Sequence, residues 1–395
     1  MSNQNHDELR MELKILNLHG SQRGLINRNT NAPIGGLEKT VVDLHNLLNS
    51  KGIECWTNST KADSLEGFYF DINPPLGSMD WSSNKRYSIY ALSIKNLIER
   101  LRFTHVIVHG ANRLARELTK LGIPFLFIDH VMDKSVNKLY HENHFRDVVP
   151  KARQNGSRFY SVSNYAKINI EKRIREQNLA EGFVFDGFIK MQYVTDELRN
   201  INLAAGDGSA ITIGRCDTNK NPAAAVSIAK KANIPLKIYA MMSNSNAKEV
   251  KYYETRLKKH SDILKLNHDR SDMLRDLASS SLYISTIPHE SAGITAFESL
   301  CCGVPVLLMT NNNDHASLIF APSNSDYIRC MSKNNLDMEW IKRIIGLSES
   351  ERRNIQKEVY EFNSGDMVVS NLVNELNKML PLSTSNNAII RSSNP

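Results

Sequence analysis

The strongest constraint on the fold is an alternation of short apolar runs with helical segments, which occurs in both halves of the chain. Stretches with apolar residues at helical spacing, such as Val41, Leu44, Leu47 and Leu48, separate runs rich in β-branched and aromatic residues. Such an alternation predicts parallel sheets covered by helices. The predicted strands are 13–19, 105–110, 124–130, 158–163, 210–215, 236–242, 263–268, 282–286 and 304–309.

A segment rich in Gly, Asp and Ala at 201–210 predicts a hinge between the halves. The 395 residues are enough for two domains, so we expect an α/β fold with two Rossmann-like domains. Because open parallel sheets bind ligands at the carboxyl ends of their strands, we expect the domains to face a central cleft. The predicted segments are an N-terminal domain at 1–200, a C-terminal domain at 201–365, closing helices at about 334–346 and 349–380, a final helix at 366–381 that packs on the N-terminal domain, and a frayed tail at 382–395.

Composition excludes few functions. The net charge of +7 and the pI of about 9.0 allow a polyanionic partner without requiring one. No apolar run reaches the ~20 residues of a membrane helix, and the N-terminus has no signal-peptide core, so we expect a soluble, cytoplasmic protein. The five cysteines lack metal-ligand spacing, which favours reduced thiols in the core.

Two glutamates, Glu290 and Glu298, lie eight residues apart in a segment that follows a predicted strand. Apolar residues at helical spacing predict a helix opened by residues 290–293 and ended by Gly303. At ~1.5 Å per residue, the acids are separated by up to roughly 12 Å, so they fit two parts of one extended ligand better than a proton-sharing dyad. The amides of 291–294 would favour an anion. Alternatively, Glu290 complements the helix dipole and Glu298 faces solvent.

The E-x7-E spacing, the G-V-P-V that follows it, and the G-R-x4-K element about 75 residues earlier resemble the donor site of retaining GT-B glycosyltransferases, the family that includes glycogen and sucrose-type synthases. The resemblance implies that Glu290 contacts the donor sugar and that Glu298 binds the nucleotide ribose. It also implies that Arg215 and Lys220 bind the diphosphate. The implied amide ligands are those of Ser291, Ala292, Gly293 and Ile294.

Two features of the N-terminal half also resemble this family. Gly35 and Gly36 form a glycine-rich turn where the family's backbone approaches the donor phosphate, and they do not form a dinucleotide fingerprint. Asp129 and His130 end a strand where the family often has a histidine that hydrogen-bonds the donor sugar, although a core histidine is an equal alternative. Asp129 and Asp133 are candidates for acceptor binding.

The resemblance covers roughly residues 13–310 and implies transfer of a hexosyl or pentosyl group to an acceptor hydroxyl with retention of configuration. The donor is expected to be a UDP-sugar, with the loop at 267–273 holding the base through its backbone. Fixed cations stabilise a leaving diphosphate, and no Asp-x-Asp element ends a strand, so we expect no obligatory metal and no cofactor. Glu290, His130, Arg215 and Lys220 are the predicted catalytic residues.

The acceptor is the last inference from sequence. The basic chain, with no evident amphipathic basic helix in its first half, resembles bacteriophage enzymes that glycosylate hydroxymethylated cytosine or uracil in double-stranded DNA. A surface glycan, a lipid and a small molecule remain alternative acceptors, and an epimerase or a non-catalytic binding protein remains an alternative function. The candidate DNA or acceptor contacts are Lys85, Arg86, Arg100, Arg102, Arg113, Arg116 and Lys138.

Overall fold

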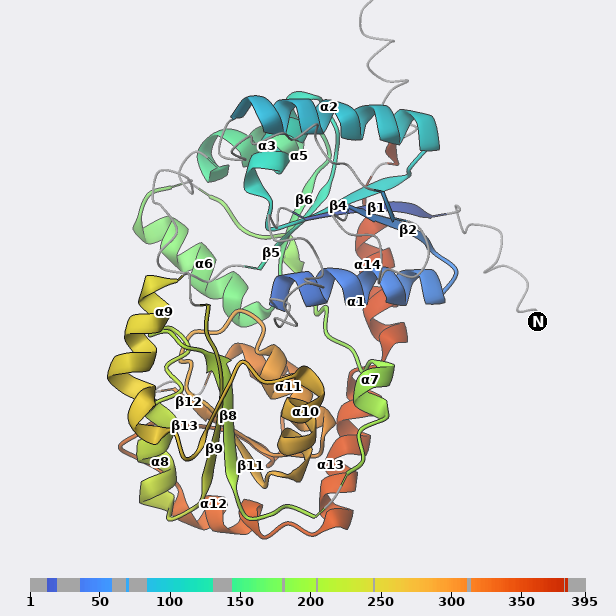
Figure 1. Ribbon diagram of the computed structural model, residues 1–395. Helices are drawn as coiled ribbons and strands as arrows, with labels where there is room; N and C mark the ends of the chain where they lie inside the picture. Colours follow the sequence, from blue (N-terminus) through green and yellow to red (C-terminus); the bar gives the residue numbers. More distant parts are fainter. Residues whose placement is uncertain are drawn as a thin grey trace, which may run out of the picture. The chain divides into compact units, whose positions relative to one another are not determined.

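The chain divides into two units, each with its own parallel sheet (Figure 1). Unit 1 contains the described residues up to Met191 and those from Val368, and unit 2 extends from Gln192 to Met367. The predicted hinge at 201–210 therefore lies inside unit 2. The computed structural model describes residues 13–19, 36–58, 69–70, 84–130, 144–179, 182–203, 205–243, 246–310, 314–379 and 381–382.

Unit 1 is a seven-stranded sheet in the order β3-β2-β1-β4-β5-β6-β7, and every pairing is parallel. Its strands are β1 (Lys14–His19), β2 (Glu54–Asn58), β3 (Tyr69–Phe70), β4 (His105–His109), β5 (Leu126–Asp129), β6 (Arg158–Ser161) and β7 (Gly187–Phe188). Its helices are α1 (Gly36–Ser50), α2 (Asn84–Leu101), α3 (Asn112–Lys120), the π-helical turn η1 (His144–Val148), α5 (Val149–Gln154), α6 (Asn164–Glu176) and most of α14 (Gly365–Leu376).

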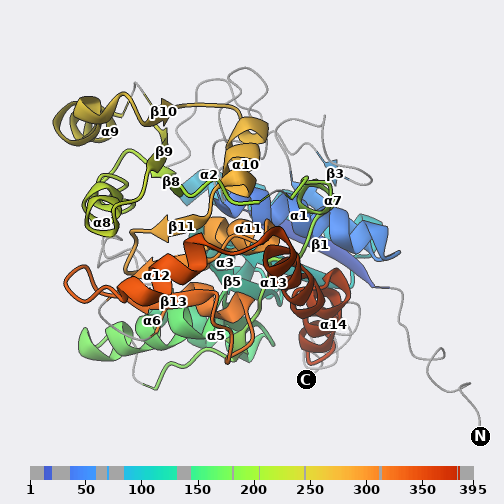
Figure 2. The same cartoon turned by 90° about the horizontal axis from the view of Figure 1, so that it is seen from below.

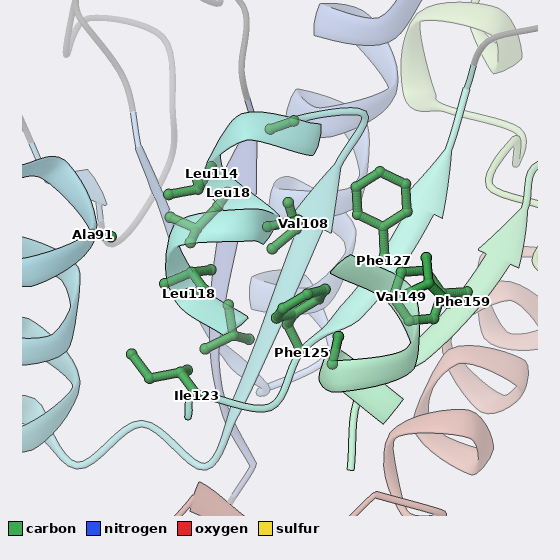
Figure 3. Packing of buried hydrophobic residues seen from close by; sticks show 14 of the residues in the cluster. Leu18, Ala91, Val108, Leu114, Leu118, Ile123, Phe125, Phe127, Val149 and Phe159 are labelled. Carbon is green, nitrogen blue, oxygen red and sulfur yellow. The ribbon is translucent and has the colours of Figure 1, made fainter. Parts of the chain in front are cut away.

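The core of unit 1 forms around β4 and β5, which are buried along their whole length, as expected for central strands of a parallel sheet. Figure 3 shows Leu114 and Leu118 of α3 against this part of the sheet. Phe159 of β6 packs on Phe127 with ring centroids 5.7 Å apart. On α14, the carboxylate of Glu375 accepts a hydrogen bond from the Tyr160 hydroxyl, which fastens this helix to β6.

Unit 2 is a six-stranded parallel sheet in the order β10-β9-β8-β11-β12-β13. Its strands are β8 (Ala210–Arg215), β9 (Leu236–Met241), β10 (Leu264–Leu266), β11 (Leu282–Ser285), β12 (Val306–Met309) and β13 (Ile328–Met331). Its helices are α7 (Asp196–Arg199), α8 (Ala224–Ala232), α9 (Ala247–Tyr252), the π-helical η2 (Tyr253–Leu257), the 3₁₀ turns η3 (Lys258–His260) and η4 (Ala316–Phe320), α10 (Arg270–Ser279), α11 (Ile294–Cys301), α12 (Met338–Ile345) and α13 (Glu349–Phe362).

Two hydrophobic clusters cover the faces of the unit 2 sheet. One contains residues of α10, α11 and α13, and the other contains residues of α8, α9 and α12. Alternate residues of β8 divide between them, since Ile211 and Ile213 belong to the first cluster and Ala210 to the second. Figure 2 shows α10 and α11 beside each other. Each predicted strand of the two halves overlaps an observed one, which confirms the α/β prediction.

The structure corrects three local predictions. The short strands β2, β3, β7 and β13 were not predicted. The predicted helix at 349–380 is broken between α13 and α14, where the Asn363 amide donates to two backbone carbonyls. The helix expected to open with residues 290–293 begins at Ile294.

All five cysteines are free thiols, and four are buried. In the described part of the chain, no helix is both long and apolar enough to span a bilayer.

Candidate functional site

Unit 2 has a topological switch point between β8 and β11, where successive parts of the chain extend toward opposite edges of the sheet. Open parallel sheets bind ligands beyond the carboxyl ends of their strands at such a point. The turns that follow β8 and β11 both lie there. Lys220 of the first turn and Glu290 of the second are 70 residues apart in sequence, and their Nζ and Oε1 atoms are 2.6 Å apart.

Asp217 organises the turn after β8. Its Oδ1 accepts a hydrogen bond from the backbone N–H of Lys220 at 2.7 Å, and its Oδ2 lies 3.2 Å from Nη2 of Arg215. The hydroxyl of Thr286, directly after β11, donates to the carbonyl of Lys220 at 2.6 Å. These bonds fix the backbone that separates the two cations and tie it to the neighbouring strand.

The two cations differ in exposure. The Arg215 side chain is 52% exposed, whereas Lys220 and Glu290 are 28% and 17% exposed. A lysine ammonium has three N–H donors, and within the described residues only Glu290 accepts one of them. Lys220 can therefore contact an anion while it holds Glu290. The site thus places a cation, Lys220, which can bind an anionic group, beside a carboxylate, Glu290, which can accept hydrogen bonds from hydroxyl groups.

Gly293 shapes the N-terminus of α11. It is the N-cap residue and has φ +71°, a left-handed conformation that excludes it from the helix itself. Ser291 and Ala292 therefore belong to the loop before α11, and the amides that lack helical partners are those of 293–296 rather than 291–294. Ile294 is the first helical residue. The helix dipole at this end favours an anion.

Glu298 does not face solvent, contrary to the simpler alternative considered above. It lies inside α11 with a side chain only 4% exposed, and its Oε1 accepts from Nη2 of Arg270 at 2.6 Å. Arg270 also donates to both carboxylate oxygens of Glu197 in α7. Glu290 and Glu298 thus pair with different cations, and neither is the other's hydrogen-bond partner.

Sequence reasoning missed Arg270 and Glu197. Burial by itself lowers the pKa of Arg270, but the charge of Glu298 and the hydrogen bonds that Arg270 donates to both glutamates raise it above its usual value. One sequence signal was present: Arg270 is the first residue of a helix, where the dipole disfavours a cation. A cation at such a position needs acidic partners, and the fold supplies two.

His315 is a second residue that sequence reasoning missed. Its ring is buried; Nε2 lies 2.9 Å from the carbonyl oxygen of Ile287, and Nδ1 accepts from the backbone N–H of Ser317 at 3.1 Å. Nε2 must therefore carry the proton. Burial lowers the pKa of His315, although the Ile287 carbonyl and the nearby Glu290 raise it. This neutral ring fixes the loop that carries Glu290.

In unit 1, three histidines gather at the switch point between β1 and β4. His19 and His109 end these paired strands, and His130 directly follows β5. Burial lowers the pKa of His130 to about 3. Burial, followed by the neighbouring His130 and His19, holds the pKa of His109 well below its usual value. The cluster is therefore uncharged at neutral pH.

Hydrogen bonds determine the tautomers of this cluster. The Asn17 amide nitrogen donates to Thr57 and to the Val41 carbonyl, so its oxygen must accept from Nε2 of His109 at 2.7 Å. Nδ1 of His109 then accepts from Nε2 of His130 at 2.9 Å. This leaves Nδ1 of His130 as a hydrogen-bond acceptor. His130 is thus a partnered histidine that can still accept from a hydroxyl.

The remaining predicted residues have varied outcomes. Asp129 is buried at the end of β5, and the Arg113 guanidinium lies 5.9 Å from the ring centre of Tyr87. Arg116 pairs with the buried Glu117 of its own helix. Within the described residues, no His, Cys, Asp or Glu cluster could hold a metal ion. The predicted residues outside the described side chains are Gly35, Lys85, Arg86, Asp133 and Lys138, and of Gly36 only its place as the first residue of α1 is described.

No family model matches the chain, and no curated protein matches its sequence. Solved structures do match. A glycosyltransferase from Rickettsia africae is 14% identical with a TM-score of 0.66, and the match covers 93% of this chain and 98% of that one. A sucrose-phosphate synthase from Thermosynechococcus elongatus is 12% identical with a TM-score of 0.63, over 92% of this chain and 98% of that one.

HepE from Anabaena, whose structure is a complex with UDP and glucose, is 13% identical with a TM-score of 0.61. That match covers 93% of this chain and 100% of that one. At such identities the similarity establishes the fold. The chain has the two Rossmann-like α/β domains of GT-B glycosyltransferases, as the motifs predicted.

Proposed function

We propose that this protein is a retaining glycosyltransferase that moves a sugar from a UDP-sugar to an acceptor hydroxyl. The observation that carries the proposal is the Lys220–Glu290 pair at the switch point of unit 2, with 2.6 Å between Nζ and Oε1. A cation beside a carboxylate suits a bond between a phosphate and a sugar, because each group addresses one side of that bond. The GT-B fold and the UDP and glucose held by a structural neighbour support the same function.

The leaving diphosphate is assigned to Arg215 and Lys220. Lys220 contacts its oxygens with N–H groups that Glu290 does not use, and the exposed Arg215 adds a second charge. The positive end of α11 supports the same anion. Fixed cations stabilise the charge that develops during departure, so the reaction needs no obligatory metal or cofactor in this proposal.

The proposed step breaks the bond between the anomeric carbon and the β-phosphate oxygen. The acceptor oxygen bonds to the same face of that carbon, and the acceptor proton passes to the departing phosphate oxygen. Glu290 holds the sugar hydroxyls and orients the anomeric carbon. Nδ1 of His130 accepts from another sugar hydroxyl, and Glu298 binds the ribose.

For the acceptor, we propose a hydroxymethylated cytosine or uracil of DNA as the first candidate, on the basis of the net charge of +7. Surface glycans, lipids and small molecules are the other candidates. Their chemistry is the same, since each offers a hydroxyl to the anomeric carbon. The acceptor therefore has to be identified by the product.

The test incubates the protein with radiolabelled UDP-glucose and related nucleotide sugars. Separate reactions contain unmodified DNA, hydroxymethylated DNA, glycan or lipid acceptors, each with and without EDTA. Labelling of hydroxymethylated DNA alone, decreasing with salt, would identify the DNA acceptor. Interconversion of nucleotide sugars without an acceptor would indicate an epimerase, and binding without any turnover would indicate a binding protein. Either of those results contradicts the proposal.

A further inference from the structure

The Glu197–Arg270–Glu298 cluster lies entirely within unit 2 and joins α7, α10 and α11. Its cation begins α10, where the helix dipole opposes positive charge. The buried carboxylate of Glu298 needs a cation, which explains its ion pair with Arg270. It does not explain why Arg270 also pairs with Glu197. Glu197 is 42% exposed and needs no counter-charge to remain solvated. The cluster therefore holds the guanidinium of Arg270 more firmly than its ion pair with Glu298 requires.

The second acid fixes the orientation of the guanidinium. Glu197 accepts from both Nε and Nη2 of Arg270, at 2.9–3.2 Å. Because a guanidinium is planar, fixing that edge also fixes the direction of both Nη1 hydrogens. In the described part of the chain, Nη1 donates to no group and Oε2 of Glu298 accepts from none. The cluster thus offers a donor and an acceptor that the described residues leave unused.

A sugar diol matches this pair of groups. Each hydroxyl of a diol can donate one hydrogen bond and accept others, so it can donate to Glu298 and accept from Arg270. We propose that Arg270, held by Glu197, recognises the ribose hydroxyls together with Glu298 and so selects ribonucleotides over 2′-deoxyribonucleotides. This inference rests on the proposed function, in which Glu298 binds the ribose of the donor.

The test measures the binding of UDP and 2′-deoxy-UDP by calorimetry to the full chain. Hydrogen bonds that involve a charged group contribute about 1.5–3 kcal/mol, so the wild type should prefer UDP by roughly 10- to 150-fold. Arg270→Gln should reduce this preference to less than about 3-fold, and Glu197→Gln should reduce it in part. Arg275→Gln is the matched control, because Arg275 lies in the same helix, is 74% exposed and pairs with Asp272 on the helix surface.

Equal losses of affinity for both nucleotides in Arg270→Gln, with the preference retained, would show that Arg270 only supports the fold and would overturn the inference. A wild type that binds both nucleotides equally would also overturn it. Thermal melting checks that each variant is folded, and the exposed Glu197→Gln carries the test if Arg270→Gln unfolds. If GDP or ADP binds in place of UDP, the same ribo and deoxy pair of that base is compared.

A different assay tests the proposed function, so the two proposals can be contradicted separately. Selective binding of UDP with no turnover of any nucleotide sugar would contradict the glycosyltransferase proposal and leave ribose recognition supported. Turnover of UDP-sugars together with equal turnover of their 2′-deoxy analogues would support the glycosyltransferase and contradict the role of Arg270.

Discussion

Replacement of Gly293 in the candidate site should lower the stability of the protein by an amount that follows from its backbone conformation and its contacts. An alanine Cβ at this position would lie 1.9 Å from Oγ and 3.0 Å from Cβ of Ser317, whose side chain is fully buried. The left-handed backbone costs a non-glycine residue about 1–2 kcal/mol. Overpacking of a buried contact adds about 1–3 kcal/mol. We therefore expect Gly293→Ala to lower the free energy of unfolding by about 2–5 kcal/mol.

The assay is thermal unfolding of the full chain, followed by circular dichroism. For a domain of 150–250 residues, each kcal/mol lowers the melting temperature by about 2–4 °C, so the transition of unit 2 should move by roughly 5–20 °C. Gly346→Ala is the matched control, because its added Cβ would meet nothing closer than 3.6 Å and its φ is negative. That variant should melt within about 2 °C of the wild type.

A double-mutant cycle separates the two contributions. Ser317→Gly removes both atoms that the new methyl group would meet, so it should recover the packing cost of Gly293→Ala and leave the backbone cost. A coupling of about 1–3 kcal/mol is expected. If Gly293→Ala alone changes stability by less than about 0.5 kcal/mol, or if the cycle shows no coupling, the proposed packing of Gly293 on Ser317 is wrong.

Three further predictions concern the diphosphate site, the histidine cluster and the end of α11. Lys220→Ala and Arg215→Ala should each lower turnover by roughly 10²–10³-fold, whereas loss of an exposed lysine such as Lys258 should not; near-normal turnover in the first two would remove them from the site. His109 stays neutral when folded but takes up a proton near pH 6.5 when unfolded, so the free energy of unfolding should fall by about 1.4 kcal/mol per pH unit below that value for this group. His109→Gln should reduce the slope of urea-unfolding free energy against pH by about one proton, and an unchanged slope between pH 6 and 4.5 would contradict the neutral cluster. Gly303→Ala would place a Cβ 2.4 Å from a backbone carbonyl oxygen of α13, which cannot rotate away, so it should cost at least about 3 kcal/mol of unfolding free energy; wild-type melting would refute this.

The sequence predicted the strands that position the site because their signals are local. The run at 210–215 coincides with β8, and its burial follows from consecutive apolar residues in a central parallel strand. Gly303 ends α11 in a left-handed conformation, as its place after the helical pattern indicated. The short β2 was missed because only Cys55 and Thr57 are fully buried in it. Two buried positions are too few to show the alternation of apolar and polar residues that predicts a strand.

The order of the strands and helices, and the spacing of the cations and acids along the chain, could be predicted from the amino-acid sequence. Which of these groups lie in contact depends on the three-dimensional fold. Lys220 reaches Glu290 because β8 and β11 are neighbours in the sheet, and Arg270 reaches Glu298 because α10 and α11 pack on the same face. Strand order and helix packing depend on contacts between residues far apart in sequence. A charged side chain that the fold buries loses its contact with water and therefore needs an oppositely charged partner nearby.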